Sequence, residues 1–308
     1  MATSTAPDEA LARTRGGRLA RRQRAVAYGL LGPGGFWLIV FFLLPVALMV
    51  YTSLETGGTL SGGYSYTFPG DWGNYPEVLS QYSTQFIRSL TYAGLATAIA
   101  LLVAYPMTYW IAFHGGRRKG AILLLILLPF FVSFVIRTVQ WKFILGDTGL
   151  IFGPLKDLGW IPEDFRVLAT PLAVVAGITY NFLPFTALPL YVSLEQIDKR
   201  LVEAAKDLYA SKWTAFRKVV LPLSIPGIFA AVLLTFVPAT GDYINSTVLG
   251  GPGTTMIGNI IQDQFLVQRD YPEAAALSAI LMLGMLILAS IYARILGTDD
   301  ASLAGAVG

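Results

Sequence analysis

The sequence predicts an all-α membrane protein with six membrane-spanning helices and a cytosolic helix pair between the fourth and fifth of them. Composition is the first reason: of 308 residues, 55% are hydrophobic and 13% are charged, whereas a soluble domain carries roughly 25% charged residues. The second reason is that the apolar residues gather in runs long enough to cross a bilayer as helices. The third is that the remaining charges are confined to short segments between those runs.

Six apolar segments can be read along the chain, and each is taken as one span. They are expected over Ala25–Leu54, Ser89–Phe113, Gly120–Ile144, Leu168–Leu194, Leu221–Thr240 and Ala274–Ala293. Polar loops are expected over Glu55–Gln85, Gly146–Val167 and Gly241–Tyr271. Residues 1–24 read as a disordered basic cytosolic tail, residues 25–297 as the transmembrane domain, and residues 298–308 as a cytosolic C-terminal tail.

The basic residues orient the chain. Sixteen of the 22 Lys and Arg residues lie on the side of the N-terminal tail, which holds the turn at residues 117–119 and the charged stretch after span four. Because cytoplasmic loops of membrane proteins are enriched in Lys and Arg, both termini and this stretch are expected in the cytoplasm.

The charged stretch, Leu201–Ile228, reads as two short helices. Leu201–Leu208 is rich in good helix formers, with Val202, Ala205, Leu208 and Tyr209 on one face. Ser211 is a plausible N-cap for a second helix that carries Trp213, Phe216 and Val220. Spacing alone allows two interpretations: a docking element for a cytosolic partner, or an amphipathic loop that rests on the lipid headgroups.

A family motif favours docking. The order Glu203-Ala204-Ala205, three residues, Tyr209, nine residues, then Val219, Val220, Leu221 and Pro222 resembles the hallmark of the permeases of ATP-binding-cassette (ABC) importers. In that family a Gly stands where this chain has Tyr209, and it makes the tight turn between the two helices. The resemblance implies the type I ABC importer permease fold, with residues 195–221 as the coupling element that docks on the ATPase. The implied coupling residues are Glu203, Ala204, Ala205, Asp207, Leu208, Tyr209, Ser211, Trp213 and Phe216.

Three further segments, Leu183–Trp213, Phe236–Gly251 and Ile257–Leu266, are similar to the permeases of spermidine/putrescine importers. This resemblance implies a bacterial inner-membrane subunit that works with a second, different permease, two copies of an ATPase and an external substrate-binding protein. ATP and Mg are expected on the ATPase, because this chain has no Gly-rich phosphate loop that ends in Lys-Ser or Lys-Thr. No cofactor, metal or nucleic acid is expected on this chain, and membrane lipid is the remaining partner.

Candidate pathway residues follow from charge. Asp242 comes after Pro238 at the outer end of span five, and an acid at the membrane edge is a candidate functional residue. Polyamines carry several ammonium groups, which carboxylates and aromatic faces bind, so Asp242, Tyr243, Tyr180 and Asn181 are expected to line one cavity. Asp242 could equally be a water-exposed cap on the external loop. Arg137 and Lys142 in span three are expected to snorkel or to pair with such acids.

Other classes of function are less well supported by the sequence. The chain has no cysteine, no intramembrane Ser/His or paired-Asp constellation and no His/acid metal cluster, so an intramembrane enzyme is not favoured. A stand-alone channel or carrier remains open, with Leu201–Val220 as a membrane-surface helix. Within the importer class, other amines, organic anions and metal complexes remain alternative substrates.

Overall fold

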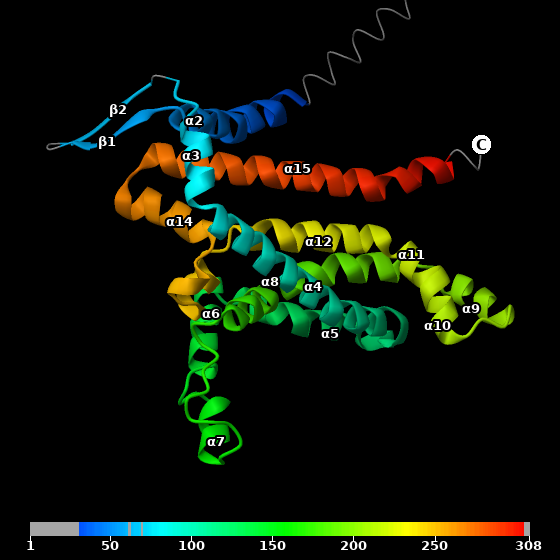
Figure 1. Cartoon of the computed structure of the whole chain (residues 1–308). Coiled ribbons are helices and arrows are strands. Elements are labelled where there is room, and N and C mark those ends of the chain that lie inside the picture. The colour runs from blue at the N-terminus through cyan, green and yellow to red at the C-terminus, as the bar shows by residue number, and fades with distance from the viewer. Residues whose placement is uncertain (1–30, 61–62, 69, 305–308) are drawn as a thin grey trace, which may run out of the picture.

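The structure is a computed structural model that describes residues 31–60, 63–68 and 70–304. The expected tail at residues 1–24, the first residues of span one and the last residues of the C-terminal tail lie outside this range. Figure 1 shows long helices running side by side, with two short helices, α9 and α10, at one end and a β-hairpin at the other.

Within the described residues, four helices are long and apolar enough to cross a membrane, and two bent helix pairs raise the number to six. The straight spans are Leu31–Thr52, which contains η1 (Ile39–Leu43) and α2 (Leu44–Thr52), followed by α4 (Ser83–His114), α8 (Pro171–Glu195) and α15 (Tyr271–Ala304). The bent pairs are Gly116–Phe131 with Phe134–Ile144, at 91°, and Lys212–Leu223 with Ile225–Thr240, at 61°. The predicted helical membrane class is therefore confirmed, with two of the six spans broken.

Span three differs most from the expectation of one helix over Gly120–Ile144. It follows the turn η2 (Gly116–Arg118) and consists of α5 (Lys119–Leu127), the 3-10 turn η3 (Leu128–Phe131) and α6 (Phe134–Ile144). Val132 and Ser133 between them have ψ angles of 141° and 136°, which are extended values. Because Pro129 has no N–H to donate, the helix weakens there, and α6 then turns across the bundle (Figure 1).

The three polar loops are more ordered than expected. The first contains a hairpin of β1 (Thr56–Leu60) and β2 (Gly63–Thr67), in which Thr56 pairs with Thr67, and then α3 (Asn74–Gln81). The second contains α7 (Phe152–Asp157). The third contains α13 (Ile244–Leu249), η5 (Pro252–Thr254), α14 (Ile257–Asp263) and η6 (Gln264–Gln268).

The core lies where α4, α8 and α12 (Ile225–Thr240) pack together. The contact face of α4 is a stripe of fully buried small residues at helical spacing: Ala93, Ala96, Ala100 and Ala104. Small residues let helix backbones approach closely in lipid, where association depends on packing contacts. Ile178 and Phe182 of α8 and Ala239 of α12 belong to the same buried cluster as the first two of these alanines.

A substitution at Gly227 can test this packing, because Gly227 lies where α12 crosses α8. A methyl group added there would collide with Cβ of Ser193 and press on the backbone oxygen of Pro189. Gly227→Ala is therefore expected to lower the free energy of unfolding by about 1–3 kcal/mol through overpacking. Thermal inactivation in detergent measures the loss. Gly284→Ala on α15 is the matched control, since nothing lies within 4 Å of its added methyl group; equal effects at the two sites would contradict the packing argument.

Candidate functional site: docking element and aromatic cavity

The charged stretch forms the two short helices that the sequence predicts. The first, α9 (Lys199–Asp207), begins after Asp198, whose Oδ1 accepts a hydrogen bond from the backbone N–H of Arg200 at 2.9 Å. The second, α10 (Lys212–Ala215), begins after Ser211, whose Oγ accepts one from the N–H of Thr214 at 3.1 Å. Ser211 is therefore the N-cap. The chain then continues through the π-helical turn η4 (Phe216–Val220) and α11 (Leu221–Leu223) to the bend before α12.

Tyr209 makes the turn between these helices in the left-handed conformation, with φ at 60°. Its N–H donates to the carbonyl oxygen of Lys206 at 2.9 Å, and the N–H of Ala210 donates to that of Ala205 at 3.0 Å. These two bonds form a Schellman motif, in which the left-handed position is usually Gly. Tyr209 therefore keeps the turn that a glycine would make.

Tyr209→Gly is expected to relieve the cost of about 1–2 kcal/mol that a side chain bears in this conformation. Tyr209→Val is expected to destabilise the turn, because a β-branched residue is a severe outlier there. The measurement is thermal inactivation of the purified protein, with the order Gly at least as stable as Tyr, and Tyr more stable than Val. A Val variant as stable as the parent would show that the left-handed turn is absent.

The apolar residues of the turn, α10 and the start of η4 lie on an inner and an outer side of this element. Phe216 lies inside, edge-on to the rings of Tyr105 and Tyr109 of α4 at 5.8 and 5.6 Å. Leu208, Tyr209 and Trp213 point outward and are 82%, 99% and 68% exposed. The sequence placed Trp213 and Phe216 on one face, whereas only Phe216 is covered by α4. The other coupling candidates, Glu203, Ala204, Asp207 and Ser211, are exposed, and Ala205 is half-buried.

Contacts at the base of this element connect it to the spans. Ser224, fully buried at the bend before α12, hydrogen-bonds through Oγ to the hydroxyl of Tyr105 at 2.7 Å. Lys119 at the start of α5 forms an ion pair of 2.6 Å with Glu195 at the end of α8. The bend before α12 is thereby tied to α4, and the start of α5 to the end of α8.

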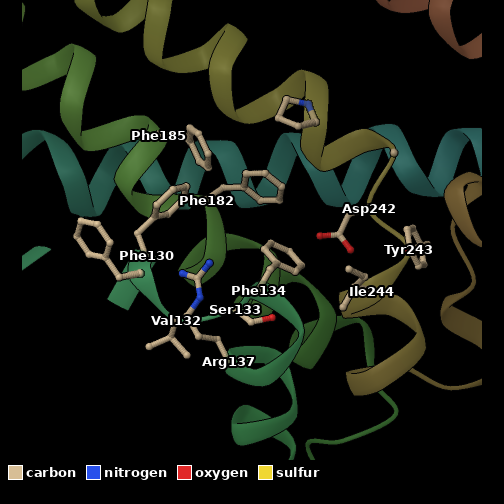
Figure 2. A pocket seen from close by; sticks show the side chains of 13 residues that line it. Phe130, Val132, Ser133, Phe134, Arg137, Phe182, Phe185, Asp242, Tyr243 and Ile244 are labelled. Atoms are coloured by element: carbon tan, nitrogen blue, oxygen red, sulfur yellow. The ribbon is translucent and has the colours of Figure 1, made fainter. Parts of the chain in front are cut away.

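A second feature is a cavity of about 510 Å³ at the break in span three. Its lining combines aromatic residues with one acid and one base: Phe130, Phe131, Val132, Ser133, Phe134, Arg137, Phe182, Phe185, Pro238, Gly241, Asp242, Tyr243 and Ile244. Figure 2 shows Asp242 and Arg137 on opposite sides of the Phe134 ring. A volume of this size suits a small solute.

Asp242 lies two residues past the end of α12 and is only 7% exposed. Its Oδ1 accepts from the backbone N–H of Asn245 at 2.8 Å, and its Oδ2 accepts from Nδ2 of the same residue at 2.7 Å. Burial raises the pKa of the Asp242 carboxyl, and the bonds from Asn245 oppose that rise. A water-exposed cap is therefore wrong, because the carboxylate caps the start of α13 from a buried position beside the cavity.

The four pathway candidates do not share one lining. Asp242 and Tyr243 line the cavity, and Tyr180 and Asn181 lie outside it. Asn181 is fully buried and donates through Nδ2 to Thr138 at 2.9 Å and to Asn245 at 3.0 Å. The ring of Tyr180 packs edge-on against Trp141, with centroids 5.1 Å apart. Asn181 thus supports Asp242 indirectly, through Asn245.

Arg137 is 7% exposed, and its guanidinium lies 5.5 Å from the ring centre of Phe130 and 5.7 Å from that of Phe134. Within the described part of the chain it forms no ion pair, and its buried Nε has no hydrogen-bond partner. The expectation that Arg137 pairs with an acid is therefore wrong for these residues. Lys142, further along α6, is exposed.

Sequence reasoning missed the aromatic lining and the role of Asn245. The five lining phenylalanines come from η3, α6 and α8, and they meet where span three breaks. Asn245 carried a signal, since it stands three residues after Asp242, the spacing at which an Asp side chain bonds a backbone N–H.

The described helices, with the exposed pair α9 and α10 at one end and a solute-sized cavity at the break in span three, are those of a multi-pass membrane transport subunit. Residues 84–298 match the family described as binding-protein-dependent transport system inner membrane component. The chain belongs to that family.

Proteins of similar sequence support this membership, and a solved structure supports the fold. The chain is 37% identical over 259 residues to the spermidine/putrescine transport system permease protein PotB of Haemophilus influenzae, covering 84% of this chain and 90% of that protein. The same identity and share of this chain hold for PotB of Escherichia coli K12, of which 93% is covered. A crystal structure of a bacterial ABC transporter that imports alginate has the same fold, with a TM-score of 0.68 at 19% identity over 91% of this chain and 99% of that chain.

Proposed function

We propose that this chain is one of two different permease subunits of an ATP-driven importer for a polyamine such as spermidine or putrescine. A separate ATPase, which binds ATP and Mg, docks on α9 and α10. An extracytoplasmic binding protein delivers the solute at the opposite end. ATP binding moves the docking element as a rigid body, and the cavity alternates between the two sides of the membrane.

The observation that carries the proposal is the Asp242 carboxylate beside an aromatic cavity. A polyamine offers ammonium groups, which a carboxylate binds by charge and an aromatic face by cation–π attraction. A second hollow, of about 340 Å³ between α3 and the start of α15, supports a cationic solute. It is lined by the carboxylates of Glu55, Asp71, Glu77, Asp270 and Glu273.

Charge supports the orientation in which α9 and α10 face the cytoplasm of a bacterial inner membrane. Basic residues gather at that end, in η2 with the start of α5 and in α9 to η4. Cytoplasmic loops carry such an excess. The first described span begins, and α15 ends, toward the end of the molecule that carries α9 and α10 (Figure 1). This arrangement fits cytoplasmic termini.

The test is uptake of labelled spermidine and putrescine by the complex in proteoliposomes with ATP inside. Uptake is expected in the parent and a loss of tenfold or more in Asp242→Asn, since the carboxylate that binds the ammonium is removed. Glu163→Gln, an acid on the segment after α7, is the control and should transport normally. Absence of uptake of both polyamines would refute the substrate and leave the fold standing.

Purification in mild detergent tests the assembly. A nucleotide-binding subunit and a second permease are expected to co-purify with a tag on this chain. A transport-competent homo-oligomer alone would instead establish a stand-alone channel or carrier.

A further inference from the structure

The α6 side of the cavity offers an anion-binding site that a polyamine does not use. Arg137 is more than nine-tenths buried, lines the cavity and has an unpartnered Nε. A buried charge without a counter-ion costs several kcal/mol. The rings of Phe130 and Phe134 offset part of that cost, but a ring face accepts no strong hydrogen bond from Nε.

The start of α6 adds to the positive electrostatic potential around Arg137. Val132, Ser133 and Phe134 line the cavity where this 11-residue helix begins, and the Ser133 side chain makes no cap bond. The first N–H groups of a helix have no intrahelical acceptor, and the helix dipole is positive at that end. Helix N-terminus and guanidinium therefore favour a negative group in one place.

Asp242 does not fill this place. Asn245 fixes its position with one bond to each carboxylate oxygen, which leaves a lone pair free on each. Figure 2 shows the Phe134 ring between it and Arg137. One cavity thus presents a carboxylate and a guanidinium at separate positions, with aromatic surface between them.

We propose that this cavity binds the carboxylate of a solute between Arg137 and the first turn of α6, while Asp242 receives the ammonium at the solute's other end. The pathway then accepts ω-amino carboxylates in addition to polyamines. A carboxylate matches the planar guanidinium through two parallel hydrogen bonds, which an ammonium cannot form. Only the part of this inference that concerns the ammonium end rests on the proposed function.

The experiment is equilibrium binding to the purified complex, washed free of its binding protein so that selectivity comes from the permease. The probes are labelled 4-aminobutyrate and labelled putrescine, small linear solutes that differ in one charged end. The complex is expected to bind 4-aminobutyrate, and Arg137→Gln is expected to weaken that binding at least tenfold while putrescine binding becomes tighter, because a charge that repels an ammonium leaves the cavity. Lys142→Gln removes the same charge from the exposed face of α6 and should change neither.

Arg137→Lys keeps the charge without the planar fork and should give an intermediate loss, which provides a second variant if Arg137→Gln folds poorly. Absence of 4-aminobutyrate binding, or binding that Arg137→Gln leaves intact, overturns the inference. Loss of the second permease from the Arg137→Gln complex also overturns the inference. It would show that Arg137 pairs with a carboxylate of that subunit and not with a carboxylate of the solute. Polyamine uptake without 4-aminobutyrate binding refutes this inference alone, and Arg137-dependent binding without polyamine uptake refutes the proposed substrate alone.

Discussion

Trp213→Ala is expected to detach the ATPase subunit from the complex while this chain still inserts and folds. The indole is 68% exposed at the start of α10, and Leu208 and Tyr209 in the preceding turn are exposed as well. It stacks on Phe216 with ring centroids 5.4 Å apart, which holds it in place before any partner arrives. An exposed, prepositioned Trp is typical of binding hot spots, whose truncation costs about 2 kcal/mol or more. That cost corresponds to roughly 30-fold weaker binding.

The measurement is the amount of ATPase subunit that co-purifies with a tag on this chain, together with ATP-driven uptake. Trp160→Ala is the matched control, because Trp160 is 76% exposed on the segment after α7, away from α9 and α10. Both should fall in the Trp213 variant and stay unchanged in the control. A Trp213 variant that transports normally would refute the docking role.

The helices α9 and α10 and the turn between them were predictable from the sequence because their determinants are local. Ser211 caps a helix that starts at the next residue, and the Schellman bonds around Tyr209 join residues three to five positions apart. The division between Trp213 and Phe216 was not predictable, because it depends on α4, which covers Phe216 from a distant part of the chain. Helical spacing alone puts both rings on one apolar face.

The break in span three shows a different limit. Pro129 stands in a continuous apolar run, so the hydropathy of the sequence predicts one unbroken span. The chain bends by 91° a few residues later, between Phe131 and Phe134. Pro106, Pro184 and Pro238, in contrast, lie inside the unbroken helices α4, α8 and α12. Proline is tolerated in membrane helices wherever neighbouring groups satisfy the freed carbonyl. The presence of a proline therefore does not decide whether a span breaks. For this reason the aromatic cavity at the break could not be predicted from the sequence.

Asp242 had two open interpretations for a related reason. Its burial depends on Asn245, which is held in turn by Asn181, 64 residues earlier in the chain. A polar network of this kind joins several segments, and its members look like ordinary loop or helix residues in the sequence. Only the folded chain shows that the carboxylate is both buried and beside the cavity.

Asn245→Leu is expected to be the most destabilising substitution at this site. It removes the 2.7 Å bond to Oδ2 of Asp242 and the acceptor for Nδ2 of Asn181, while the backbone N–H to Oδ1 remains. A hydrogen bond to a charged group contributes about 1.5–3 kcal/mol, and the one N–H of the Asn181 amide that is left without an acceptor adds about 1–3 kcal/mol. Thermal inactivation of the purified complex should therefore shift strongly downward. Gln140→Leu on the exposed face of α6 is the control and should leave stability nearly unchanged.

The same network separates the structural role of Asp242 from its role in binding. Asp242→Asn keeps an acceptor for the backbone N–H of Asn245 and leaves no unpaired buried charge, but it loses the bond from Nδ2 of Asn245. Its stability is therefore expected to fall less than that of Asn245→Leu, while ammonium binding is lost. The pair Asp242→Leu and Asn245→Leu should be less destabilising together than the sum of the single variants, because the double variant leaves no buried carboxylate unpaired. Additive losses would show that the two side chains are not coupled. Asp242 would then act in the cavity without the support that Asn245 gives it.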